Sequence, residues 1–207
     1  MRGAWDFVRR HQVIRCCFSW GGILFLAFAA VEPVKWPSPP TRWAPRPTGF
    51  AVALAAWGVG MVAGGAALPA LLQRVAASWI LPLGGAAVAV ALLGAGLAPS
   101  LPALVGWSLI GGAGNGAFAA TFLTVVQERT PDSLQVRVSA LYEIVITVSL
   151  GLGLVAGGLL GAAAGPRAVY VVGGTVGIAA AIRLGLGLRS ATRVARRFTL
   201  RREPIAS

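Results

Sequence analysis

Three side chains inside otherwise apolar stretches could take part in chemistry: Trp57, Asn115 and Glu143. An ionisable group within a membrane is costly, so it faces a cavity or a partner, and a carboxyl there is a candidate proton carrier. An amide in the middle of an apolar helix hydrogen-bonds a neighbouring helix or a bound molecule. We therefore take these three residues as candidates for a path used by a solute and a proton.

Each candidate also has a simpler interpretation. Glu143 is expected more readily at the cytoplasmic rim of its helix, paired with Arg137 or Arg129. Asn115 is expected more readily to hold two helices together, since packing is the commoner role of a buried amide. Both alternatives stay open at the level of the sequence.

The sequence lacks the sets of residues that enzymes use for catalysis. His11 is the only histidine, and it stands in a basic N-terminal segment where no Ser, His and acid triad can be assembled. The glycine-rich stretches lack the Lys and Ser or Thr of a phosphate-binding loop. Cys16 and Cys17 are adjacent, which is not the spacing of a metal site. We expect no catalytic residue, no metal and no cofactor, and we predict that the protein is not an enzyme.

The composition indicates a membrane protein. Of the 207 residues 57% are hydrophobic and only 12% are charged, and the mean hydropathy is +0.76. A net charge of +12 would suggest nucleic-acid binding in a soluble protein. Here the charges lie between and beyond apolar blocks, so we interpret them as topology signals and as attraction to lipid headgroups. The expected partner is the lipid bilayer and not a nucleic acid.

The apolar residues fall into six blocks, each long enough to cross a bilayer as a helix. Proline and polar clusters separate the blocks, and all loops but the first are short. The sequence therefore predicts an all-α, polytopic membrane protein with six transmembrane helices. Residues 1–15 would form a basic cytoplasmic segment, 16–188 the transmembrane domain and 189–207 a basic cytoplasmic tail. The predicted spans are 16–34, 50–72, 78–97, 101–126, 138–164 and 169–188.

The distribution of Lys and Arg predicts the orientation. With six spans, 14 of the 18 basic residues collect on the side of both termini. The positive-inside rule then makes both termini cytoplasmic in the plasma (inner) membrane. A rival interpretation is that residues 1–29 are a cleaved signal peptide, because a basic start and an apolar run precede a small-x-small triplet at 27–29. Five remaining helices would satisfy the same charge count.

Glycines four residues apart recur within the apolar blocks. Small residues at this spacing share one helix face and let two helix backbones approach closely. The pattern predicts a tightly packed bundle, with these six glycines at helix contacts: Gly60, Gly64, Gly112, Gly116, Gly153 and Gly157.

Four stretches of the sequence resemble a known family. They are GAWDFVRRH at 3–11, PTGF with AWGVG over 47–60, the glycines of 112–116 with FLTVVQERTPD at 122–132, and RVSALY at 137–142 with the glycines that follow. In this order they resemble the C-terminal six-helix half of a major facilitator superfamily transporter, closest in kind to macrolide-efflux and siderophore-exporter drug and proton antiporters. Two departures are Val136 before Arg137, where the family has Gly, and a charged motif reduced to Arg74.

The resemblance implies half of a twelve-helix bundle that exports a small amphipathic organic solute by alternating access, with protons as counter-ion. In that superfamily the substrate binds between two six-helix halves. The resemblance therefore also implies a partner, either a second copy of this chain or a separately encoded N-terminal half. The alternatives are a non-transporting accessory subunit of the membrane and an inactive transporter fragment.

Overall fold

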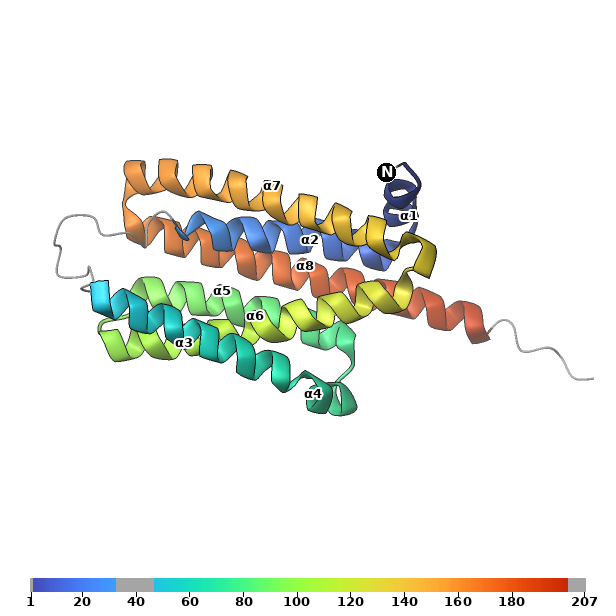
Figure 1. The fold of residues 1–207 in the computed structure, drawn as a ribbon, viewed down its shortest axis with the longest axis horizontal. Coiled ribbons are helices and arrows are strands. Elements are labelled where there is room, and N and C mark those ends of the chain that lie inside the picture. Colours follow the sequence, from blue (N-terminus) through green and yellow to red (C-terminus); the bar gives the residue numbers. More distant parts are fainter. Residues whose placement is uncertain (1, 33–46, 201–207) are drawn as a thin grey trace, which may run out of the picture.

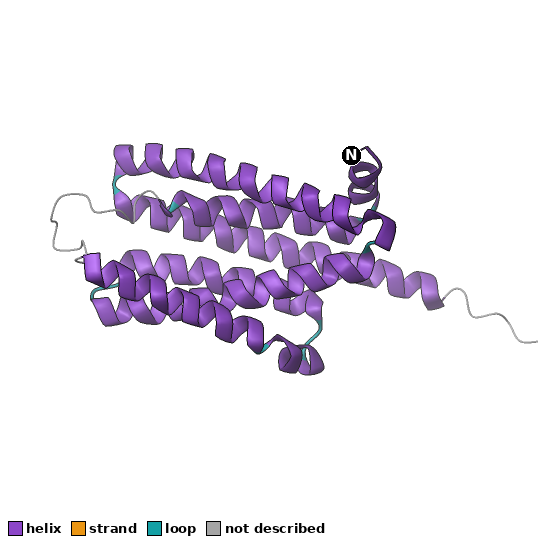
Figure 2. Ribbon diagram, in the orientation of Figure 1, coloured by secondary structure: helices purple, strands orange, loops and turns teal. Residues whose placement is uncertain are grey.

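The computed structural model describes residues 2–32 and 47–200. Every regular element within these ranges is a helix (Figure 2). The helices are α1 (Arg2–Arg10), α2 (Gln12–Ala30), α3 (Pro47–Ala66), α4 (Leu68–Arg74), α5 (Ala77–Leu97), α6 (Leu101–Arg129), α7 (Asp132–Ala164) and α8 (Pro166–Leu200).

Five of the described helices are long and apolar enough to cross a membrane: α2, α5, α6, α7 and the first part of α8, Pro166–Ser190. A sixth span is formed if α3 and α4 count as one, since a 47° bend separates Ala51–Ala66 from Leu68–Arg74. The predicted fold class, an all-α polytopic membrane protein, is confirmed.

The chain bends between α3 and α4, within the predicted span 50–72. Pro69 stands in the first turn of α4. A proline has no N–H to donate, and its ring clashes with the carbonyl four residues earlier, which bends a helix. The first part of the block is thus the long helix, and α4 turns away at its end.

Other helices extend beyond the apolar blocks. Helix α7 begins at Asp132, before the predicted span start at residue 138, and α2 begins at Gln12, before the predicted span start at residue 16. Hydropathy marks the part of a helix that lies in hydrocarbon, whereas the backbone stays helical through adjacent polar residues. The last residues of the predicted span 16–34, together with the first outer loop, lie outside the described residues.

The long helices form two groups of three (Figure 1). One group contains α3, α5 and α6, and the other contains α2, α7 and α8. The two groups meet mainly where α5 packs against α8. Side chains of α2 and α6 also meet, with the Phe18 and Phe122 rings 6.2 Å apart between centroids.

Glycines set the closest helix contacts. A Cβ on Gly60 or Gly64 would meet the backbone of Leu109 and Ala113 on α6, and a Cβ on Gly112 or Gly116 would meet the backbone of α3. Gly153 and Gly157 lie in the same way against α2, at Leu26, Ala29 and Ala30. Because no side chain separates these backbones, each helix pair is held in one register.

Exposed arginines gather at one end of the bundle. Figure 1 places α1, α4, the turn between α6 and α7, and the later part of α8 at this end. The basic side chains that the structure describes there are Arg9, Arg10, Arg15, Arg74, Arg129, Arg137, Arg183 and Arg189. At the opposite end, the described chain has Arg167 after the turn into α8. We call the arginine-rich end the basic end.

Candidate functional site

The candidate site is a small pocket of about 20 Å³ between α2 and α6, with α5 behind it. It is lined by Leu24, Phe25 and Phe28 of α2, Gly85 and Val88 of α5, and Asn115 and Phe118 of α6. Gly84 and Gly85 bring α5 close, since a Cβ on either would meet α6 or the Leu24 side chain. The pocket is therefore apolar, and the Asn115 amide is its polar group.

Trp57 lies at the edge of this pocket. Its ring stacks on Phe28, with centroids 5.2 Å apart and an angle of 29° between the planes. The same ring covers Gly111, which leaves no room for a Cβ there. Phe28 thus joins Trp57 and Asn115 into one surface, although the two residues lie on different helices.

The Asn115 side chain retains most of its hydrogen-bonding capacity. Its Nδ2 donates to the Met61 sulfur at 3.5 Å. A thioether is a weak acceptor, and an amide offers two donors and an acceptor. Asn115 is only half-buried, so its amide can exchange this contact for a stronger one to a bound molecule.

Glu143 does not join Trp57 and Asn115. It is exposed on α7, where it stands eleven residues after the helix start at Asp132. At a rise of about 1.5 Å per residue this is about 16 Å along the helix. The carboxyl therefore belongs to the exposed side of α7 and is not a lining group of the pocket.

Sequence reasoning missed an aromatic cluster on the basic side of the pocket. The Tyr142 ring stacks on Phe122 with centroids 4.0 Å apart and meets Phe18 edge-on at 5.8 Å. Phe118 continues the cluster toward the pocket, 6.3 Å from Phe122. The signal in the sequence was the spacing of Phe118 and Phe122, because residues four apart share one helix face.

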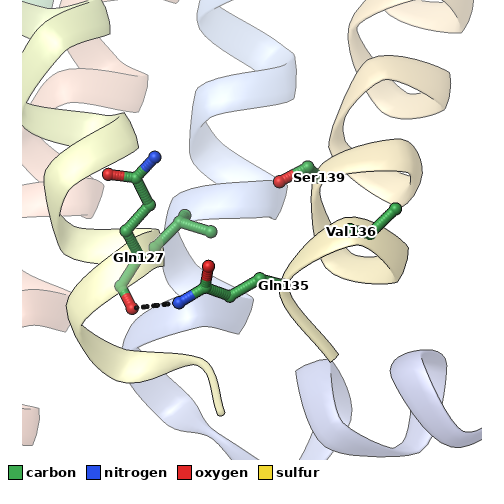
Figure 3. A pocket seen from close by; sticks show the side chains of 5 residues that line it. Gln127, Gln135, Val136 and Ser139 are labelled. Atoms are coloured by element: carbon green, nitrogen blue, oxygen red, sulfur yellow. Dashed lines mark hydrogen bonds between the residues drawn. The ribbon is translucent and has the colours of Figure 1, made fainter. Parts of the chain in front are cut away.

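A second pocket lies near the basic end, between α6 and α7. It has a volume of about 290 Å³ and is lined by Val126, Gln127, Gln135, Val136 and Ser139 (Figure 3). The Gln135 Nε2 donates to the Gln127 carbonyl and the Thr130 carbonyl, each at 3.4 Å, and to the Asp132 carboxylate at 3.1 Å. Gln135 thereby ties the end of α6 to the start of α7. The pocket offers amides and a hydroxyl, which bind by hydrogen bonds but do not provide acid and base catalysis.

The described residues contain no group of three or more His, Cys, Asp or Glu placed to hold a metal ion. Both cysteines are free, Cys17 buried and Cys16 half-buried. The small pocket between α2 and α6 thus offers apolar and aromatic surface and one amide.

Comparison with protein-family models gave a match over residues 23–206 to the model described as Major Facilitator Superfamily. Comparisons with curated proteins and with solved structures gave no match. The matched range contains all the long helices of the bundle except the first part of α2.

Proposed function

Because the chain belongs to the Major Facilitator Superfamily, a family of membrane transporters, we propose that it exports a small amphipathic organic solute. The transport is driven by protons and uses alternating access. The chain provides one six-helix unit, and a second unit closes the other side of the solute site. That unit is a second copy of this chain or a separately encoded one.

The observation that carries the proposal is the pocket between α2 and α6. Aromatic rings of Phe25, Phe28 and Phe118 provide its walls, and Asn115 adds one amide. Aromatic faces bind apolar rings and organic cations. An amide that has only a sulfur contact is available to a polar group of the solute. The pocket chemistry therefore matches one side of a molecule with an apolar body and a polar end, and the second unit would enclose the rest of it.

Glu143 supports the proton part of the proposal. An exposed carboxyl on a membrane-spanning helix needs water, a cation or a proton to balance its charge. In the proposed mechanism Glu143 takes up and releases the coupling proton on the α7 side, while the solute is held at Trp57 and Asn115. Because different residues bind the solute and the proton, a substitution can weaken solute binding without affecting proton coupling, or the reverse.

The proposed orientation has both termini in the cytoplasm and the protein in the inner membrane. Its support is the basic end of the bundle, where eight described arginines gather. The positive-inside rule places such an end on the cytoplasmic side.

The test begins with native mass spectrometry of the detergent-purified full chain, alone and after co-expression with a candidate second unit. The assembled species is then reconstituted into vesicles with an imposed pH gradient, and efflux of the amphipathic dye ethidium is followed by fluorescence. Asn115→Leu is expected to lower dye flux by about tenfold, the equivalent of one hydrogen bond to the solute. Glu143→Gln is expected to abolish the dependence of flux on the pH gradient and to leave downhill flux in place.

Leu83→Ala is the matched control, since Leu83 is 58% exposed on α5, a helix that also reaches the pocket. Its flux should equal that of the wild type. A stable complex with a second membrane protein and no dye flux in any variant would instead support the accessory subunit. A monomer that finds no partner and carries no dye would support the inactive fragment.

A further inference from the structure

The basic end carries a short helix whose placement the transport proposal does not explain. A break at His11, whose backbone is extended at φ −96° and ψ 102°, separates α1 from α2. Figure 1 shows that α1 turns across the end of the bundle and does not continue the axis of α2. A helix that crosses a membrane-spanning bundle at its end runs along the membrane surface.

One face of α1 is fixed to the bundle. Val8 is 4% exposed and belongs to the apolar core that includes Ile14 and Val138. Phe7 packs against the same core. The Phe7 ring also meets the His11 ring, with centroids 4.0 Å apart and an angle of 34° between the planes. The angle of α1 is therefore set by packing.

The other face of α1 carries one large ring, two positive charges and one negative charge. Trp5 is 49% exposed, and Arg9, four residues later on the same face, is exposed beside it. Arg10 is also exposed. Tryptophan prefers the boundary between headgroups and acyl chains, and arginine reaches phosphates at the same level. This combination is typical of helices that lie in a membrane interface.

A third guanidinium completes the cluster. Arg15, on the first turns of α2, donates through Nη1 to the Arg9 carbonyl at 3.5 Å. Its charge is thereby held close to the end of α1, where Arg9 and Arg10 stand. Asp6, the only acidic residue on α1, is exposed on the same face, three residues before Arg9 and four before Arg10, so it offsets one of the three positive charges. The cluster therefore has an excess of positive charge where an anionic headgroup would be.

We propose that α1 lies flat in the membrane interface and that Arg9, Arg10 and Arg15 together hold the phosphate of an anionic phospholipid. Trp5 lies among the glycerol and upper acyl groups of the same lipid. Charge complementarity argues for this occupant, and planar guanidinium groups fit phosphate oxygens better than a point charge does. The proposal concerns a specific lipid site and does not depend on which solute is transported.

The test is native mass spectrometry of the full chain purified with phosphatidylglycerol or with phosphatidylcholine. Wild-type protein is expected to retain one phosphatidylglycerol in preference to phosphatidylcholine. The double variant Arg9→Gln with Arg10→Gln should bind phosphatidylglycerol at least about tenfold more weakly, since each arginine near an anionic surface contributes about 1 kcal/mol, or about fivefold. The matched control, Arg74→Gln with Arg129→Gln, removes two exposed charges from the same end and should retain the lipid.

Equal loss of the lipid in both double variants would overturn the site, because the attraction would then be a property of the whole basic end. Equal retention of the two lipids by the wild type would overturn it as well. A second measurement needs no change of charge: bromine-labelled phosphatidylglycerol should quench wild-type tryptophan fluorescence more than that of Trp5→Phe. The same quenching in both proteins would place Trp5 outside the interface and contradict the proposal.

Discussion

Helix α6 meets its neighbours on two sides that are built in opposite ways. Against α3 it presents Gly112 and Gly116, which lie on the backbone carbonyls of Trp57 and Met61. Toward α2 it presents aromatic rings, and Phe122 lies 6.2 Å from Phe18 between ring centroids. Glycine brings backbones together, whereas rings hold them apart. The first side therefore fixes the bundle, and the second borders the small pocket at which a solute is proposed to bind.

This comparison separates stability from binding. A change on the glycine side should alter the free energy of unfolding, because backbone atoms cannot give way to a new side chain. A change at the pocket should alter binding more than unfolding, because Phe25, Phe28 and Asn115 are only half-buried there. Variants on the two sides of one helix can test the distinction.

The largest effect is expected for Gly116→Ala. The new Cβ would meet the backbone carbonyl group of Met61, so α3 and α6 would have to move apart. We expect a loss of about 3 kcal/mol in the free energy of unfolding, at the upper end of the usual cost of overpacking. The measurement is the loss of helical circular dichroism as sodium dodecyl sulfate is titrated into mixed micelles.

Gly106→Ala is the control on the same helix, since a Cβ on Gly106 meets nothing within 4 Å. It should unfold at the same detergent fraction as the wild type or slightly later, because alanine favours the helix more than glycine does. If both variants lost stability equally, the cost would come from glycine removal in general and the close contact would not be its cause.

A smaller effect is expected at the other glycine contact. A Cβ on Gly157 would meet the backbone of Ala30 on α2, but only 11% of the spanning window of α7 is buried. Because α7 can shift outward, Gly157→Ala should cost about 2 kcal/mol of unfolding free energy. Gly158→Ala, with nothing within 4 Å of its Cβ, should be neutral. A penalty at residue 158 as large as at 157 would contradict the proposed contact.

The two sides of α6 also differ in how far the sequence predicts them. Paired glycines repeat every four residues, so a close helix contact at Gly60 and Gly64 follows from a periodic pattern and a short-range rule. The pocket depends on how each helix is rotated about its axis, and the uniformly apolar blocks carry no signal for that rotation. The sequence therefore identified Asn115 and Trp57 as candidates. Only the structure shows that Phe28 lies between them, stacked on Trp57 and lining the same pocket as Asn115.

Local backbone chemistry explains two further differences. Pro69 lies within one apolar block, and the length of that block predicted one span where the chain bends. The placement of Glu143 away from the pocket depends on the face of α7 that packs on α2, which Gly153 and Gly157 determine. The glycines were predicted at helix contacts, but the sequence does not state which helix each one meets.

On the aromatic side, Asn115→Leu should leave the unfolding free energy within about 1 kcal/mol of the wild type, because the amide gives up only a weak contact to sulfur. Ethidium binding, measured by fluorescence titration of the detergent-purified protein, should weaken by about tenfold. This is the reverse of the result expected for Gly116→Ala. A loss of stability equal to that of Gly116→Ala would show that Asn115 holds helices together and does not serve the pocket.

The smallest effect is expected where neither glycine nor the pocket is involved. Arg189 of α8 lies over the Trp79 ring of α5, 3.7 Å from its centroid, and Trp79 is 46% exposed. Trp79→Leu should lower the unfolding free energy by about 0.5 to 1 kcal/mol, the usual value of a cation–π contact at an exposed site. Trp79→Phe keeps a weaker π face and should fall between the wild type and Trp79→Leu in the same detergent titration. If Trp79→Leu cost as much unfolding free energy as Gly116→Ala, the contact between α5 and α8 would stabilise the bundle as strongly as the glycine contacts of α6 do. The difference between the two sides of α6 would then not explain the stability of the bundle.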